Sequence, residues 1–229
     1  MAFSACTTQQ INSTLGTLLN GGLSSETIAD GLKEALNLGA RRGSDELSAQ
    51  GGYFNDLAYR ILLPPEAQKV TNKLRGIPGF SDLETQVIRK INQGAEDAAK
   101  EAAPIFLEAI KQMTIQDALG ILKGDKDAAT QYLQRVTFEQ LYAKFNPVIV
   151  TSLDKFSART IWSDAVNTYN RIPLVTQVNN DLDDYVTRQA LNGLFKKVAL
   201  EELNIRTNLN ARTSELLRKV FAQQDATGK

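Results

Sequence analysis

The chain has 229 residues, of which 42% are hydrophobic and 23% are charged, a composition typical of a folded globular protein. Lys plus Arg and Asp plus Glu each number 26, so no overall basic excess indicates a nucleic-acid partner. The sequence has no histidine and one cysteine, which excludes histidine-dependent triads, histidine-ligated metals and an intramolecular disulfide. We expect no nucleic-acid partner, no cofactor and no metal site, although residue counts alone leave oxygen-ligated calcium or magnesium open until the acidic runs are considered below.

The cysteine is Cys6, in the stretch FSACTTQQ. Small residues before a cysteine and a polar segment after it resemble the end of a bacterial lipoprotein signal. If a longer leader precedes this stretch, Cys6 would be the lipidated first residue; the alternative is a chance cysteine in a flexible N-terminus. No apolar run approaches the roughly 18–20 residues of a membrane helix. We expect residues 1–23 to form a flexible tether, with membrane contact only through an N-terminal lipid.

Helical spacing of apolar residues begins early in the chain. Residues 24–42 predict a helix with a serine cap, and Gly43 is expected to interrupt it. Residues 51–68 contain adjacent glycines, an aromatic pair and a proline pair. They predict an extended arm packed on the domain, followed by a helix that starts near Glu66.

The middle of the chain carries several helix-start signals. Ser81 and Glu84 have the spacing of a capping box at the start of a helical segment over residues 81–113. Pro104 falls inside that segment, so the helix should kink there or restart with Pro104 in a first turn. A segment over residues 114–141 predicts two short helices and the start of a third. Thr114 with Asp117 caps the first of these, and Thr137 with Gln140 caps the third.

The C-terminal half has the clearest helical pattern, at residues 157–173, 181–206 and 211–224. No alternating strand pattern persists. The sequence predicts an all-α fold, a compact single-domain array of about seven to ten helices. We expect the domain to span residues 24–224 and to be followed by a disordered tail, 225–229.

Few polar residues form a recognisable chemical motif. The acidic run at 179–185 fails the calcium-loop pattern at its glycine and final glutamate positions, so helix capping explains it. Glu202 and Arg206 have the spacing of a surface ion pair, which we favour over acid–base chemistry. Tyrosines and the single tryptophan either line a ligand cavity or pack in the core. The candidate ligand or partner contacts are Arg60, Tyr132, Trp162, Tyr169, Tyr185, Glu202, Arg206 and Arg212.

Several blocks together resemble the bacterial family called domain of unknown function 4197. The resemblance covers the chain from about Gly31 to Phe221. Arg60 matches the arginine of a segment similar to I-R-I-P-L-P in that family. The resemblance implies a helical fold and an exported envelope protein, often with a lipoprotein-type leader, but no activity. The blocks lie at residues 94–122, 127–133, 141–149, 181–195 and 201–221.

Three functions remain open at this point. The first is a non-enzymatic binding module of the periplasm or outer membrane, which recognises a small apolar ligand or a protein partner. The second is a hydrolase or lyase run by carboxylates and tyrosine. The third is a structural subunit of an envelope assembly. The residues suspected in the enzymatic hypothesis are Asp117, Tyr185, Glu202, Arg206 and Arg212.

Overall fold

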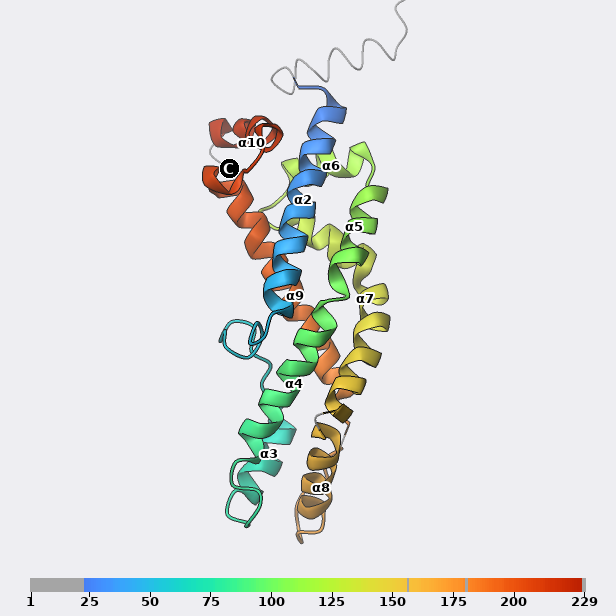
Figure 1. Ribbon diagram of the computed structural model, residues 1–229, viewed down its shortest axis with the longest axis vertical. Coiled ribbons are helices and arrows are strands. Elements are labelled where there is room, and N and C mark those ends of the chain that lie inside the picture. Colours follow the sequence, from blue (N-terminus) through green and yellow to red (C-terminus); the bar gives the residue numbers. More distant parts are fainter. Residues whose placement is uncertain (1–22, 156, 180, 228–229) are drawn as a thin grey trace, which may run out of the picture. The chain divides into compact units, whose positions relative to one another are not determined.

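The computed structural model describes residues 23–155, 157–179 and 181–227 (Figure 1). Over these residues the protein is all-α, with nine α-helices, one short 3-10 helix and no strand, as the sequence predicts. The helices are α2 (Ser25–Ser48), α3 (Pro65–Leu74), α4 (Leu83–Ala99), α5 (Ala102–Gln112), α6 (Ile115–Lys123), α7 (Ala128–Lys155), α8 (Ala158–Asn170), α9 (Asp183–Thr207), η1 (Leu209–Ala211) and α10 (Glu215–Thr227).

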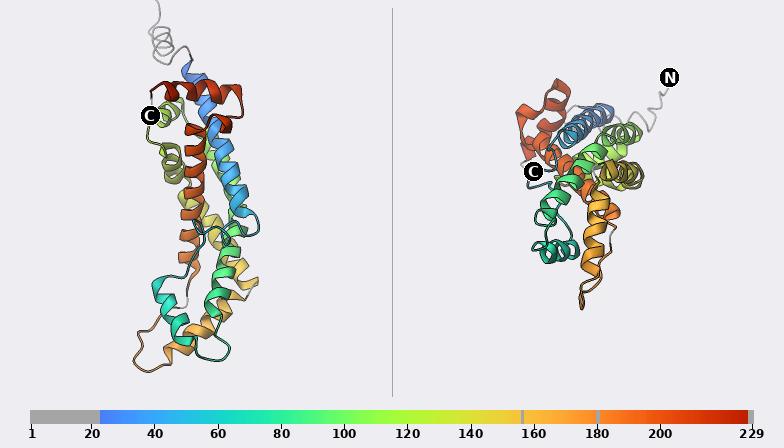
Figure 2. Two further views of the ribbon diagram at one scale, coloured as in Figure 1. Left: turned by 90° about the vertical axis from the view of Figure 1, so that its left-hand side faces the viewer. Right: turned by 60° about the horizontal axis from the view of Figure 1, so that its bottom comes forward.

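The described residues form two compact units. The first unit contains residues 23–42, 106–136 and 198–227, and the second contains 43–105 and 137–197. Helices α2, α5, α7 and α9 each contribute residues to both units. Within the second unit, α3, α4 and α8 lie side by side (Figure 2).

In the first unit, α2 packs closely against α10. A Cβ atom added at Gly31 would lie 2.5 Å from Cγ2 of Val220, so the missing side chain allows the two helices to approach. The cap predicted at the start of α2 is present, because the Thr27 amide donates to Ser24 Oγ at 3.1 Å. The predicted break at Gly43 is wrong. The helix continues to Ser48 because Gly43 keeps helical geometry, and the left-handed turn falls at Gly51, with φ +83°.

The segment between α2 and α3 is the predicted arm. Its Tyr53 side chain is fully buried in the second unit, and the hydroxyl donates to the Ala190 carbonyl at 2.7 Å. Burial raises the pKa of Tyr53. Gly193 provides the room: a Cβ atom there would lie 2.8 Å from the Tyr53 ring. The arm therefore packs against α9 through an aromatic ring rather than through regular structure.

Helix α4 fixes the backbone of the arm. The Asn92 side chain accepts from the Ile61 amide and donates to the Ile61 carbonyl, both at 2.8 Å. One turn further along, Glu96 Oε1 accepts from the amides of Tyr53 and Phe54 at 3.3 and 3.2 Å. The two buried side chains replace the backbone partners that an irregular segment lacks.

The boundaries of α4 and α5 correct one prediction and confirm another. No capping box forms at Ser81, because α4 begins at Leu83. Its N-cap residue is Asp82, whose side chain makes no capping hydrogen bond. The Glu84 carboxylate pairs instead with Arg75 at 3.2 Å. The restart expected near Pro104 is present, since α5 begins at Ala102 and places the proline in its first turn.

Helix α7 is longer than the sequence signals indicate. The capping box of Thr114 and Asp117 at the start of α6 is confirmed. The predicted cap at Thr137 is wrong, because Thr137 lies in the interior of α7. This helix is 28 residues long and also contains Pro147. The physical reason is a buried stripe at four-residue spacing that includes Thr137 itself. The stripe consists of Leu133, Thr137, Leu141, Phe145 and Ile149.

Candidate functional site

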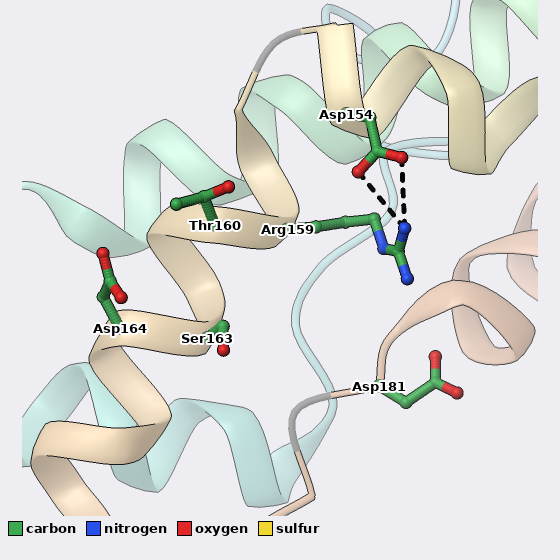
Figure 3. Close-up of a pocket in the computed structure, with 6 residues that line it drawn as sticks. All are labelled: Asp154, Arg159, Thr160, Ser163, Asp164 and Asp181. Atoms are coloured by element: carbon green, nitrogen blue, oxygen red, sulfur yellow. Dashed lines mark hydrogen bonds and ion pairs between the residues drawn. The ribbon is translucent and has the colours of Figure 1, made fainter.

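A groove of about 500 Å³ opens beside the first turns of α8 in the second unit (Figure 3). Its volume is in the range of small-molecule and side-chain binding sites. Figure 3 shows Arg159 extending from α8 toward the carboxylate of Asp154, at the end of α7, while Asp181 lies on the segment that leads into α9. The lining is polar throughout and consists of Asp154, Arg159, Thr160, Ser163, Asp164 and Asp181.

Arg159 organises the charges of the groove. Its Nη1 lies 3.2 and 3.1 Å from the two carboxylate oxygens of Asp154, and its Nε lies 3.4 Å from Asp183 Oδ2. Asp181 Oδ1 accepts from the Asp183 amide at 2.9 Å, which is the capping role predicted for this acidic run. Three aspartates, Asp154, Asp164 and Asp181, line the groove with this one arginine, so the groove carries a negative excess.

Asp183 lies beside the groove, and the pKa of its carboxyl group is raised mainly by burial. The charges of Asp181 and Asp154 raise this pKa further, although Arg159 opposes them. Since the folded-state pKa lies above the unfolded value, the stabilising contribution of Asp183 is present at low pH. It is lost as the pH rises through the folded pKa. A cation in the groove would favour the charged carboxylate and offset this loss.

A small apolar chamber adjoins the groove, and Arg159 lines both the chamber and the groove. The chamber's volume of about 10 Å³ corresponds to roughly one water molecule, so it holds no apolar ligand in this conformation. Trp162 is 2% exposed, and its indole N–H has no acceptor among the described residues. The remaining lining residues are Val87, Ile91, Leu153, Ala158, Leu182 and Asp183.

The predicted Glu202–Arg206 pair forms, but it is buried in the first unit rather than placed on the surface. Arg206 donates from Nε and Nη2 to Glu202 Oε1 at 3.0 and 2.8 Å, and both side chains are less than 10% exposed. Glu202 also accepts from the amides of Ala129 and Thr130 at 3.0 and 2.8 Å. It therefore caps the N-terminus of α7, where the helix dipole favours a negative charge.

The two arginines of this region cap helix C-termini. Arg206 donates to the Ile121 and Leu122 carbonyls at the end of α6. Arg212, which is fully buried, donates to the Ile205 and Arg206 carbonyls at 3.0 and 2.8 Å, at the end of α9. The carboxylate and guanidinium groups suspected in the enzymatic hypothesis thus satisfy helix ends, and they do not line the groove.

The other predicted residues are dispersed. Tyr185 donates to the Leu62 carbonyl at 2.9 Å and so helps to hold the arm. Tyr169 is buried in α8. In the first unit, burial and the charge of Asp117 raise the pKa of Tyr132, while Asp117 itself caps α6. None of these side chains lines the groove, and Arg60 lies on the arm.

Cys6 lies outside the part of the chain that the structure describes. No group of three or more histidine, cysteine, aspartate or glutamate side chains in that part could hold a metal ion. No helix there is long and apolar enough to cross a membrane.

The sequence analysis did not predict three of the groove residues, Asp154, Arg159 and Asp164. The signal available was the acidic run that contains Asp181 and Asp183, which does not fit the calcium-loop pattern. What the sequence did not show is that α7 ends at Lys155 and that α8 brings an arginine back toward that run.

The fold and the groove define an all-α protein with a polar, acidic hollow in one of its two units. Residues 22–222 match the family model described as a protein of unknown function, DUF4197. The chain therefore belongs to this family, as the sequence blocks indicated. Searches of curated proteins and of solved structures find no match.

Proposed function

We propose that the protein is a non-enzymatic binding module of the bacterial cell envelope, and that its groove receives a basic segment of a protein partner. The observation that carries this proposal is a hollow of about 500 Å³ that is lined by three aspartates, Asp154, Asp164 and Asp181, and by one arginine, Arg159. A lysine or arginine side chain complements such a lining by charge and by hydrogen bonding.

The contacts made by the buried residues Glu202, Arg206 and Arg212 support binding rather than catalysis. Catalytic acids and bases need access to a substrate. Glu202 instead accepts three hydrogen bonds from α7 and is paired with Arg206, while Arg212 is fully buried against backbone carbonyls. These groups therefore stabilise helix ends.

The lining also favours a basic partner over a small apolar ligand. Every lining residue of the groove is polar, and the adjoining apolar chamber has room for roughly one water molecule. The raised pKa of Asp183 means that its charged form is disfavoured in the free protein, so a cation bound beside it would stabilise the carboxylate.

We expect a hexalysine peptide to bind saturably at low ionic strength and to change the fluorescence of Trp162, the single tryptophan, which lies against Arg159. The double variant Asp154→Asn/Asp181→Asn should weaken binding about threefold to tenfold, because exposed charge pairs contribute up to about 1 kcal/mol each. Physiological salt should weaken it further.

The matched control is Asp30→Asn/Asp125→Asn, which removes two exposed aspartates from the first unit. This variant should bind the peptide as the unmodified protein does. Equal loss in both double variants would show attraction by net charge alone and would contradict a site in the groove.

The envelope location rests on Cys6 and its neighbours. We expect the protein isolated from its own cell envelope to carry a mass excess on Cys6 that survives denaturation. A Cys6→Ser variant should lack the excess and move to the soluble fraction. An unmodified Cys6 in envelope-derived protein would refute lipid attachment and leave the groove proposal unaffected.

The raised pKa of Asp183 favours a second candidate function, a carboxylate-dependent hydrolase, because perturbed carboxyl groups in clefts are common in active sites. Assays with chromogenic ester, phosphoester and glycoside substrates test it. Turnover that Asp183→Asn abolishes, while Asp164→Asn retains it, would favour the enzyme over the binding module.

A further inference from the structure

The arm of the second unit presents apolar side chains to solvent. Leu57 is 82% exposed and Leu62 is 53% exposed. The backbone that carries them is nevertheless fixed, because Asn92 binds both polar backbone groups of Ile61 and Tyr53 is fully buried. The two leucines are therefore held outward by a rigid support.

Three basic side chains lie at the arm: Arg60 belongs to it, Arg89 comes from α4 and Lys196 comes from α9. The Cζ atoms of Arg60 and Arg89 lie 4.8 and 4.6 Å from the centre of the Phe54 ring, which orients both guanidinium groups. Lys196 donates to the Ala58 carbonyl at 3.1 Å. Among the described residues, none of the three forms an ion pair with a carboxylate.

We propose that this surface, which we call the arm surface (Leu57, Arg60, Leu62, Arg89 and Lys196), docks on a bilayer that contains anionic phospholipid. Guanidinium groups bind phosphate through paired hydrogen bonds, and lysine adds a point charge. Each basic residue near an anionic membrane surface contributes to attraction, and exposed leucines enter the boundary between headgroups and acyl chains.

A lipid surface fits the arm surface better than an acidic protein does. Two leucines on one short segment offer far less apolar area than a stable protein interface needs. Interfacial membrane binding requires only a few inserted apolar side chains when basic residues flank them. The arm surface is separate from the groove lining, so it goes beyond the proposed binding function.

The test uses the full chain with Cys6→Ser, so that no lipid anchor contributes. Co-sedimentation should show binding to vesicles of equal parts phosphatidylglycerol and phosphatidylcholine, and little binding to phosphatidylcholine alone. Arg89→Gln should weaken the partition coefficient about fivefold, and Arg60→Gln/Arg89→Gln about 25-fold, at low salt. Leu57→Ser should weaken it by a comparable factor.

Two control variants change exposed residues of the same unit away from the arm: Arg171→Gln and Leu174→Ser. Both should retain vesicle binding. Arg89 is exposed and makes no hydrogen bond among the described residues, so its single variant tests the surface without disturbing the fold. Absent binding, equal binding to the two vesicle types, or equal losses in the controls would overturn the proposal.

Discussion

Replacement of Arg206 by methionine should lower the free energy of unfolding by about 3–5 kcal/mol, because Glu202 would remain buried with its charge uncompensated. Loss of the guanidinium would also remove the hydrogen bonds that it donates to the Ile121 and Leu122 carbonyls at the end of α6. Urea unfolding followed by far-ultraviolet circular dichroism measures the change.

The chain contains a matched control. Glu215 and Lys219 form an ion pair of the same i,i+4 spacing at 2.7 Å, but both side chains are more than half exposed. Lys219→Met should cost less than about 1 kcal/mol, the usual range for surface pairs. If Arg206→Met cost no more than this control, the buried, capping role of Arg206 would be wrong.

The second large effect concerns the arm. Asn92→Leu should lower the free energy of unfolding by about 2–4 kcal/mol, because the Ile61 amide and carbonyl would both lose their partner inside the protein. The arm should also become a site of rapid trypsin cleavage, since its one basic residue, Arg60, would no longer be held near α4. Chemical unfolding and limited proteolysis measure the two consequences.

Gln93→Leu provides the control for Asn92→Leu, because it changes a neighbouring amide of α4 that makes no hydrogen bond among the described residues. Its stability should change by less than about 0.5 kcal/mol, as for substitutions away from specific contacts. Intact, trypsin-resistant protein after Asn92→Leu would show that the arm is held by other contacts.

The helix signals that the sequence predicts correctly are local. Ser24 caps α2, and Thr114 with Asp117 caps α6, because the donor and acceptor lie within three residues of each other. Gly43 and Thr137 mislead for a different reason. Gly43 lies within α2 and Thr137 within the buried stripe of α7, where packing outweighs the local preference of either residue to end or cap a helix.

The candidate site shows why distant contacts escaped prediction. The sequence identified Glu202 and Arg206 as a pair from their spacing, but not the Ala129 amide that Glu202 caps 73 residues away. The acidic run before α9 was visible, whereas the groove requires Asp154 and Arg159 beside it. Such arrangements depend on how helices pack, and one sequence carries no direct signal for them.

The central claim, that the groove receives a partner, is tested most directly by site-specific photo-cross-linking in the native cell envelope. Thr160 lines the groove, and Asn167 is an exposed residue of the same helix outside the lining, so a benzophenone amino acid is placed at each. We expect a discrete cross-linked protein at Thr160 alone, lost when Asp154→Asn and Asp181→Asn are added. Identical products from both positions, or none from Thr160, would contradict a binding role for the groove.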